Sequence, residues 1–200
     1  DGVTHHGVFD MAAFGAVPGL TIAAPMNEPE LRNMMYTALG SGHPFMIRYP
    51  RGHGEGLPWR GEKFETLPVG RGRRLREGAD VALLTVGTVG NAAARAAGRA
   101  AAEGVSVAHY DLRFVKPLDE ALLDEVGRKF RRVVTVEDGS LRGGVGEAVT
   151  AFFNARGCEV AVHSLGIGDE WVEHGTPGQL YALCGYDEEG ILRALLDTRA

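Results

Sequence analysis

Cysteine is scarce in this 200-residue chain, and the two that it has, Cys158 and Cys184, lie far apart and outside any CxxC motif. Their scarcity argues against a disulfide scaffold or a structural zinc site and is typical of a reducing compartment, so we expect a cytoplasmic protein. Long apolar runs are also lacking. No stretch approaches the roughly 20 residues that a membrane-spanning helix needs, and we expect no membrane partner.

Positive charge is in short supply as well. The formal net charge is −5, which gives nucleic acid no overall electrostatic attraction, and we expect no nucleic-acid partner. The basic residues do cluster at "RGRRLR", residues 71–76. One short cluster of this kind is more typical of a solvent-exposed strand or turn than of a binding stripe.

The sequence alternates between short apolar runs and helical patterns. Buried strands are predicted at residues 20–25, 44–50, 79–87, 105–112, 131–138 and 159–167. Helices are predicted between them, one beginning after Asn27 as N-cap, and two more close the chain. Residues 51–68 are rich in Gly, Pro and charge and are predicted to be a linker. This order indicates an α/β fold with a mostly parallel sheet.

The chain opens on "DGVTHHGVFD", a polar segment interrupted by glycines, as is typical of an active-site loop. Glycine allows a sharp turn beside a ligand, and His5 and His6 titrate near neutrality and can move protons. Asp1 lies within reach to orient an imidazole or to bind a substrate hydroxyl. Two other interpretations stay open: a surface loop with solvated histidines, and a metal site formed by Asp1, His5 and His6.

A second candidate is "RYPRG", at the end of a predicted strand. Ligands of parallel α/β sheets collect beyond the carboxyl ends of strands, and the planar fork of an arginine suits a phosphate. We assign Arg51 to the ligand and Arg48 to a structural ion pair. The alternative is that both are ordinary surface arginines.

A third segment, "DGSLRGGVGEAV", resembles a glycine-rich phosphate loop, because it follows a strand and opens a helix. It matches neither of the usual phosphate-loop patterns. We therefore expect close packing of a helix N-terminus on the sheet, with anion binding there as the alternative.

Taken together, "DGVTHHGVFD", "APMNEPELRNMMYTAL", "RYPRG", "DLRFVKPLDEALL" and "EHGT…LYALCGYDEEGI" closely resemble the 1-deoxy-D-xylulose-5-phosphate synthase family, whose members are transketolase-like. The resemblance runs in order over nearly the whole chain. It implies that residues 1–54 are the end of a pyrimidine-binding domain, 55–68 a linker and 69–200 a transketolase C-terminal domain. It also implies a piece of a larger enzyme, with most of the binding motifs for thiamine diphosphate and Mg²⁺ outside it.

The family condenses pyruvate with D-glyceraldehyde 3-phosphate, with loss of CO₂, to make a precursor of isoprenoids, thiamine and pyridoxal. By resemblance, His5 is the active-site histidine, Asp1 holds the acceptor's hydroxyl and Arg51 grips its phosphate. His6 falls at a variable position and is given no catalytic role. The family also implies a homodimer.

Two alternatives remain open. In the first, the parent protein is another thiamine enzyme, such as a sugar transketolase or the β-subunit of a 2-oxo acid dehydrogenase. Alternatively, this piece is a non-catalytic dimerisation module. In either case we expect the chain alone to be inactive.

Overall fold

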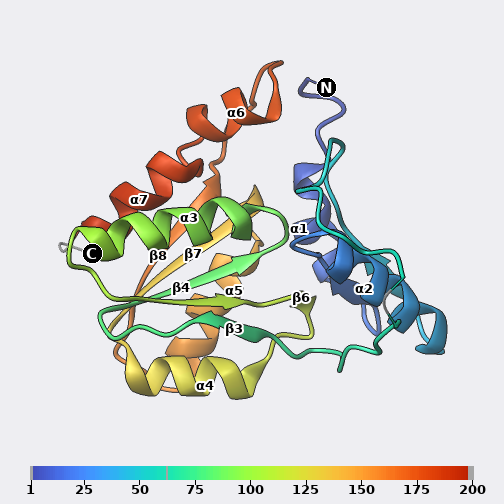
Figure 1. Ribbon diagram of the computed structural model, residues 1–200, viewed down its shortest axis with the longest axis horizontal. Helices are drawn as coiled ribbons and strands as arrows, with labels where there is room; N and C mark the ends of the chain where they lie inside the picture. Colours follow the sequence, from blue (N-terminus) through green and yellow to red (C-terminus); the bar gives the residue numbers. More distant parts are fainter. Residues whose placement is uncertain (1, 62, 198–200) are drawn as a thin grey trace.

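The computed structural model describes residues 2–61 and 63–197, which form two sheets of unequal size (Figure 1). The smaller sheet has the order β2-β1-β6 and the larger β3-β5-β4-β7-β8. The strands are β1 (Thr21–Ala23), β2 (Phe45–Ile47), β3 (Arg73–Arg76), β4 (Val81–Val86), β5 (Val107–Asp111), β6 (Phe114–Lys116), β7 (Arg132–Ser140) and β8 (Ala161–Ile167). The helices are α1 (Asp10–Gly15), α2 (Glu28–Gly40), α3 (Val89–Ala102), α4 (Glu120–Lys129), α5 (Val145–Ala155), α6 (Pro177–Leu183) and α7 (Glu188–Leu196), with a 3₁₀ turn, η1, at Gly7–Phe9.

The larger sheet is mostly parallel. Strand β4 runs parallel to β5 and β7, and β7 runs parallel to β8, while β3 pairs antiparallel with β5 at one edge. The expected α/β class is confirmed, and a strand overlaps each of the six predicted ranges, with β7 extending two residues past residue 138. The sequence did not predict β6, because three residues directly after another strand carry no periodic pattern.

Apolar side chains cover both faces of the larger sheet. One cluster joins its strands to α3 and α7, and a second joins them to α4 and α5. Figure 1 shows α3 and α7 on one side of the sheet and α4 on the other. No helix in the described part of the chain is long and apolar enough to cross a bilayer.

The two predicted units are in contact through β6. This strand follows β5 in the chain but pairs antiparallel with β1 of the smaller sheet. The connection turns at Arg113, whose φ of +60° lies in the left-handed region. Residues 51–61 and 63–72 contain no helix or strand, as expected of the linker region, and the exact boundaries at 54 and 69 stay predictions.

Helix α2 starts as predicted. The Asn27 side chain accepts a hydrogen bond from the backbone N–H of Glu30, which caps the helix. Two acidic residues in the first turn, Glu28 and Glu30, are favoured there by the helix dipole. Glu30 meets the basic cluster at residues 71–76, part of which forms the edge strand β3. Most of this cluster is exposed, as expected, while Arg73 is half-buried and pairs with Glu30 and Asp111.

Candidate active site

A cavity of about 530 Å³ lies where the smaller sheet meets the carboxyl ends of β7 and β8. Both His5 and Arg51 line it. Its other walls come from η1 and α1, from the end of β7 and from the region of α6: His6, Gly7, Val8, Asp10, Arg48, Tyr49, Pro50, Asp138, Ile167, Val172, Gly175, Pro177, Leu180, Tyr181, Cys184 and Tyr186. His5 and Arg51, which are 46 positions apart in the sequence, therefore line the same cavity.

The histidine loop is a tight turn built on Gly2. The Gly2 carbonyl accepts hydrogen bonds from the backbone N–H groups of His5 and His6, at 2.9 and 3.1 Å. Gly2 has φ +88°, and a Cβ at this position would come within 2.7 Å of the His174 ring. The positive φ favours glycine at this position. The turn leaves His5 exposed, with its Nδ1 2.8 Å from the Thr4 hydroxyl.

His6 anchors this loop to the C-terminal part of the chain. Its Nε2 lies 3.0 Å from the Val172 carbonyl oxygen. A carbonyl only accepts, so Nε2 carries the hydrogen and donates it. Next to this bond, the rings of Phe9 and Trp171 meet edge to face, with centroids 5.8 Å apart. His6 thus has a structural contact, and the interpretation of both histidines as merely solvated is wrong.

Arg48 forms the ion pair expected of it. Its Nε lies 3.3 Å from the Asp10 carboxylate and its Nη1 3.3 Å from that of Asp138, and Nη2 also donates to the Asp138 carbonyl. The Arg48 side chain is 9% exposed. Arg51, three residues further on, is exposed and lines the cavity. The arginines thus occupy different surroundings.

Asp138 is the centre of the inner wall, and the sequence did not single it out. Besides Arg48, its carboxylate accepts hydrogen bonds from the hydroxyls of Tyr181, at 3.2 Å, and Tyr186, at 2.9 Å. Burial, reinforced by the negative charge of Asp138, raises the pKa of both phenols, which stay protonated and donate. The rule that selected Arg51, a position at the carboxyl end of a strand, also selects Asp138.

The glycine-rich segment packs as predicted. The buried carboxylate of Glu137 accepts from the backbone N–H groups of Val145, at 2.9 Å, and Gly146, at 2.8 Å. A Cβ at Gly144 would lie 2.5 Å from the same carboxylate. The Glu137 carboxylate thus already occupies two amides at the N-terminus of α5, which confirms the close packing of this helix on the sheet.

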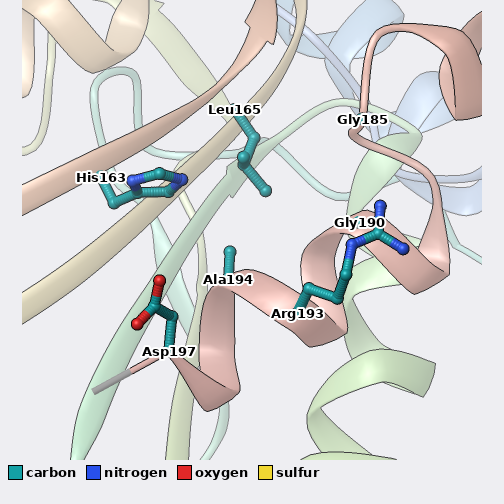
Figure 2. Close-up of a pocket in the computed structure, with 7 residues that line it drawn as sticks. All are labelled: His163, Leu165, Gly185, Gly190, Arg193, Ala194 and Asp197. Atoms are coloured by element: carbon teal, nitrogen blue, oxygen red, sulfur yellow. The ribbon is translucent and has the colours of Figure 1, made fainter. Parts of the chain in front are cut away.

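Asp1 lies outside the described residues. Within residues 2–61 and 63–197, no cluster of three metal-ligating side chains occurs. A smaller cavity of about 260 Å³ lies between β8 and α7, where His163 and Asp197 face the same space (Figure 2). Neither His5 nor Arg51 lines this second cavity.

Comparison with known proteins gives the family. Residues 70–191 match the transketolase C-terminal domain, and residues 1–55 match the transketolase pyrimidine-binding domain. The chain belongs to the transketolase C-terminal domain family. This membership agrees with the order of the two units that the sequence predicted.

Several curated relatives of this transketolase-family chain are 1-deoxy-D-xylulose-5-phosphate synthases. A 1-deoxy-D-xylulose-5-phosphate synthase from Bacteroides fragilis is 54% identical over 100% of this chain and 31% of its own length. Synthases from Bacteroides thetaiotaomicron and Symbiobacterium thermophilum are 52% and 44% identical over 98% and 96% of the chain. The chain spans about a third of the length of these relatives.

A solved structure shares the fold. The protein described as "Split gene transketolase, inactive beta4 tetramer" superposes with a TM-score of 0.85 at 27% identity, over 97% of this chain and 62% of its own. The transketolase-like arrangement of the two sheets thus extends over nearly the whole chain.

Proposed function

We propose that this chain is part of a thiamine diphosphate-dependent 1-deoxy-D-xylulose-5-phosphate synthase, which joins pyruvate to D-glyceraldehyde 3-phosphate and releases CO₂. The observation that carries the proposal is the 54% identity to a protein of that name over the full chain. The shared cavity of His5 and Arg51 supports it, because the reaction needs a proton carrier and a phosphate-binding cation at one place.

Arg51 binds the phosphate of the aldehyde acceptor. Arg51 is exposed and lines the cavity, and the planar fork of a guanidinium can donate two parallel N–H groups to a phosphate. Arg48 is committed to Asp10 and Asp138 on the inner wall, so its charge is already balanced by carboxylates. We therefore assign the phosphate to Arg51, the more exposed of the two arginines.

His5 handles the proton at the reacting oxygen, and Asp1 holds the acceptor's hydroxyl. Nδ1 of His5 lies beside the Thr4 hydroxyl, so we assign the proton transfer to Nε2. An imidazole can accept a proton at one ring nitrogen and return it in a later step.

Thiamine diphosphate, when bound, supplies the electron sink for the loss of CO₂. The described residues do not fit its metal and diphosphate end, because the glycine-rich helix terminus is filled by Glu137. We therefore assign Mg²⁺ and the diphosphate to other parts of the enzyme. The two unpaired cysteines support a cytoplasmic location. The tetramer described for the structural relative supports self-association, and we propose a homodimer.

The full-length enzyme containing this chain tests the proposal. Supplied with pyruvate and D-glyceraldehyde 3-phosphate, it should release CO₂ and form 1-deoxy-D-xylulose 5-phosphate. Arg51→Ala should raise the KM for the phosphorylated aldehyde, with a loss of about 2–4 kcal/mol in transition-state binding, and affect unphosphorylated glyceraldehyde much less. Turnover with ketose phosphate donors alone would favour a sugar transketolase, and dependence on a lipoyl partner would favour a dehydrogenase subunit.

A further inference from the structure

The segment that carries Arg51 has no secondary structure of its own. Residues 49–56, called here the arginine loop, form no helix or strand, and most of them are exposed. The loop separates the cavity described above from a neighbouring cavity of about 500 Å³, and Tyr49, Pro50 and Arg51 line both. Hydrogen bonds to other elements hold both ends of this loop.

The first end is fixed by Arg48. Its backbone N–H donates to the Ala23 carbonyl at 2.8 Å, which ties the residue to β1. Its guanidinium is held between Asp10 and Asp138, whose own carboxylate is 9% exposed and is bound by the two tyrosine hydroxyls. Charged hydrogen bonds at this degree of burial are stronger than those on the surface. The chain therefore enters the loop from a point locked onto β7.

The second end is fixed by Glu28, in the first turn of α2. Its Oε1 accepts from the Gly56 backbone N–H at 2.7 Å. The carboxylate also packs on Gly54, where a Cβ would come within 2.2 Å of it. Backbone hydrogen bonds, first that of Glu28 itself and then that of Gly56, hold the pKa of Glu28 below its ordinary value, so the group is charged at neutral pH.

We propose that Asp138 and Glu28 are positioning residues for Arg51: they fix the two ends of the arginine loop and so hold its guanidinium where the acceptor phosphate binds. The inference rests on the proposed function. Asp138 acts through Arg48. Glu28 acts through the backbone of residues 54–56. A displacement of about 1 Å in a binding group is enough for a large loss of productive binding.

Steady-state kinetics of the full-length enzyme test this inference. Asp138→Asn and Glu28→Gln keep the side-chain shape and remove the charge. Each should raise the KM for D-glyceraldehyde 3-phosphate about tenfold, with kcat within about threefold and unphosphorylated glyceraldehyde unaffected. In an Arg51→Ala background, neither substitution should raise that KM more than about twofold further, because the group that they position is gone.

The matched control is Asp169→Asn, a carboxylate 84% exposed in a surface pair with Arg142, which should leave all parameters unchanged. Tyr186→Phe removes one donor to Asp138 and keeps the ring, so it serves if Asp138→Asn fails to fold, with an expected rise of about threefold. Equal losses for both acceptors, or full additivity with Arg51→Ala, would overturn the positioning role. A wild-type enzyme that makes no deoxyxylulose phosphate, or an Arg51→Ala variant without phosphate discrimination, would overturn the proposed function and this inference with it.

Discussion

The imidazole of His109 lies 2.9 Å from the hydroxyl of Thr85, where β5 and β4 run side by side in the centre of the larger sheet. The ring is 1% exposed. Burial, reinforced by the charges of Arg73 and Arg76, lowers the pKa of His109 to about 4. The folded protein therefore keeps this histidine neutral at pH values where an unfolded chain protonates it.

This buried histidine should make the fold sensitive to acid. Because its pKa is near 6.5 in the unfolded chain and about 4 in the fold, the unfolded state binds more protons between these values. The stability due to neutral His109 is present above about pH 6.5 and is lost as the pH falls toward 4. Urea unfolding of wild type and His109→Gln at several pH values measures this. The difference in unfolding free energy between wild type and His109→Gln should change between about pH 6.5 and pH 4 and stay constant above pH 6.5.

An acid on α2 should hold the two predicted units together. Glu30 accepts from Arg113 at 2.7 and 2.9 Å and from Arg73 at 2.8 Å, and its side chain is 6% exposed. Glu30→Gln leaves two arginines short of their partner. Because Arg73 keeps Asp111 and is partly exposed, we expect a loss of about 2–3 kcal/mol in unfolding free energy, less than for a fully buried pair. The control is Glu103→Gln, at an exposed residue directly after α3, and an equal loss of unfolding free energy there would contradict the assignment.

His109 and Arg51 show what could and could not be predicted from the sequence. Strand periodicity predicts β5 correctly, and the position of Arg51 at the end of a strand predicts that it lines a cavity. Periodicity does not tell that His109 faces the interior beside Thr85, because a histidine on an apolar strand suits either face. Which strands become neighbours depends on the whole fold.

The ion pairs illustrate the same limit. Arg48 was expected in an ion pair, but its partners Asp10 and Asp138 lie 38 and 90 residues away in the sequence. Likewise, the pairing of β6 with β1 depends on a contact between predicted units and on the left-handed turn at Arg113. Local patterns carry no signal for such distant contacts.

His5 should affect turnover rather than acceptor binding. His5→Ala in the full-length enzyme should lower kcat by roughly 10²–10⁴ if the imidazole moves a proton in the rate-limiting step. His6→Ala is the contrasting variant, because His6 only ties the loop to Val172. It should lower kcat far less. Similar losses in kcat for both variants would indicate that His5 acts only through the loop's shape.

Isothermal titration calorimetry of the 200-residue chain alone should show no tight binding of thiamine diphosphate with Mg²⁺. The physical reason is that the Glu137 carboxylate already occupies the N-terminus of α5, the glycine-rich helix. A diphosphate brought to the N-terminus of α5 would meet the Glu137 carboxylate, which holds the Val145 and Gly146 amides that an anion would need. An external diphosphate would therefore have to displace a carboxylate that belongs to the chain itself. The full-length enzyme, titrated in the same buffer, is the positive control. Micromolar binding to the chain alone would mean that a diphosphate site exists within it, and the assignment of that site to other parts of the enzyme would have to be abandoned.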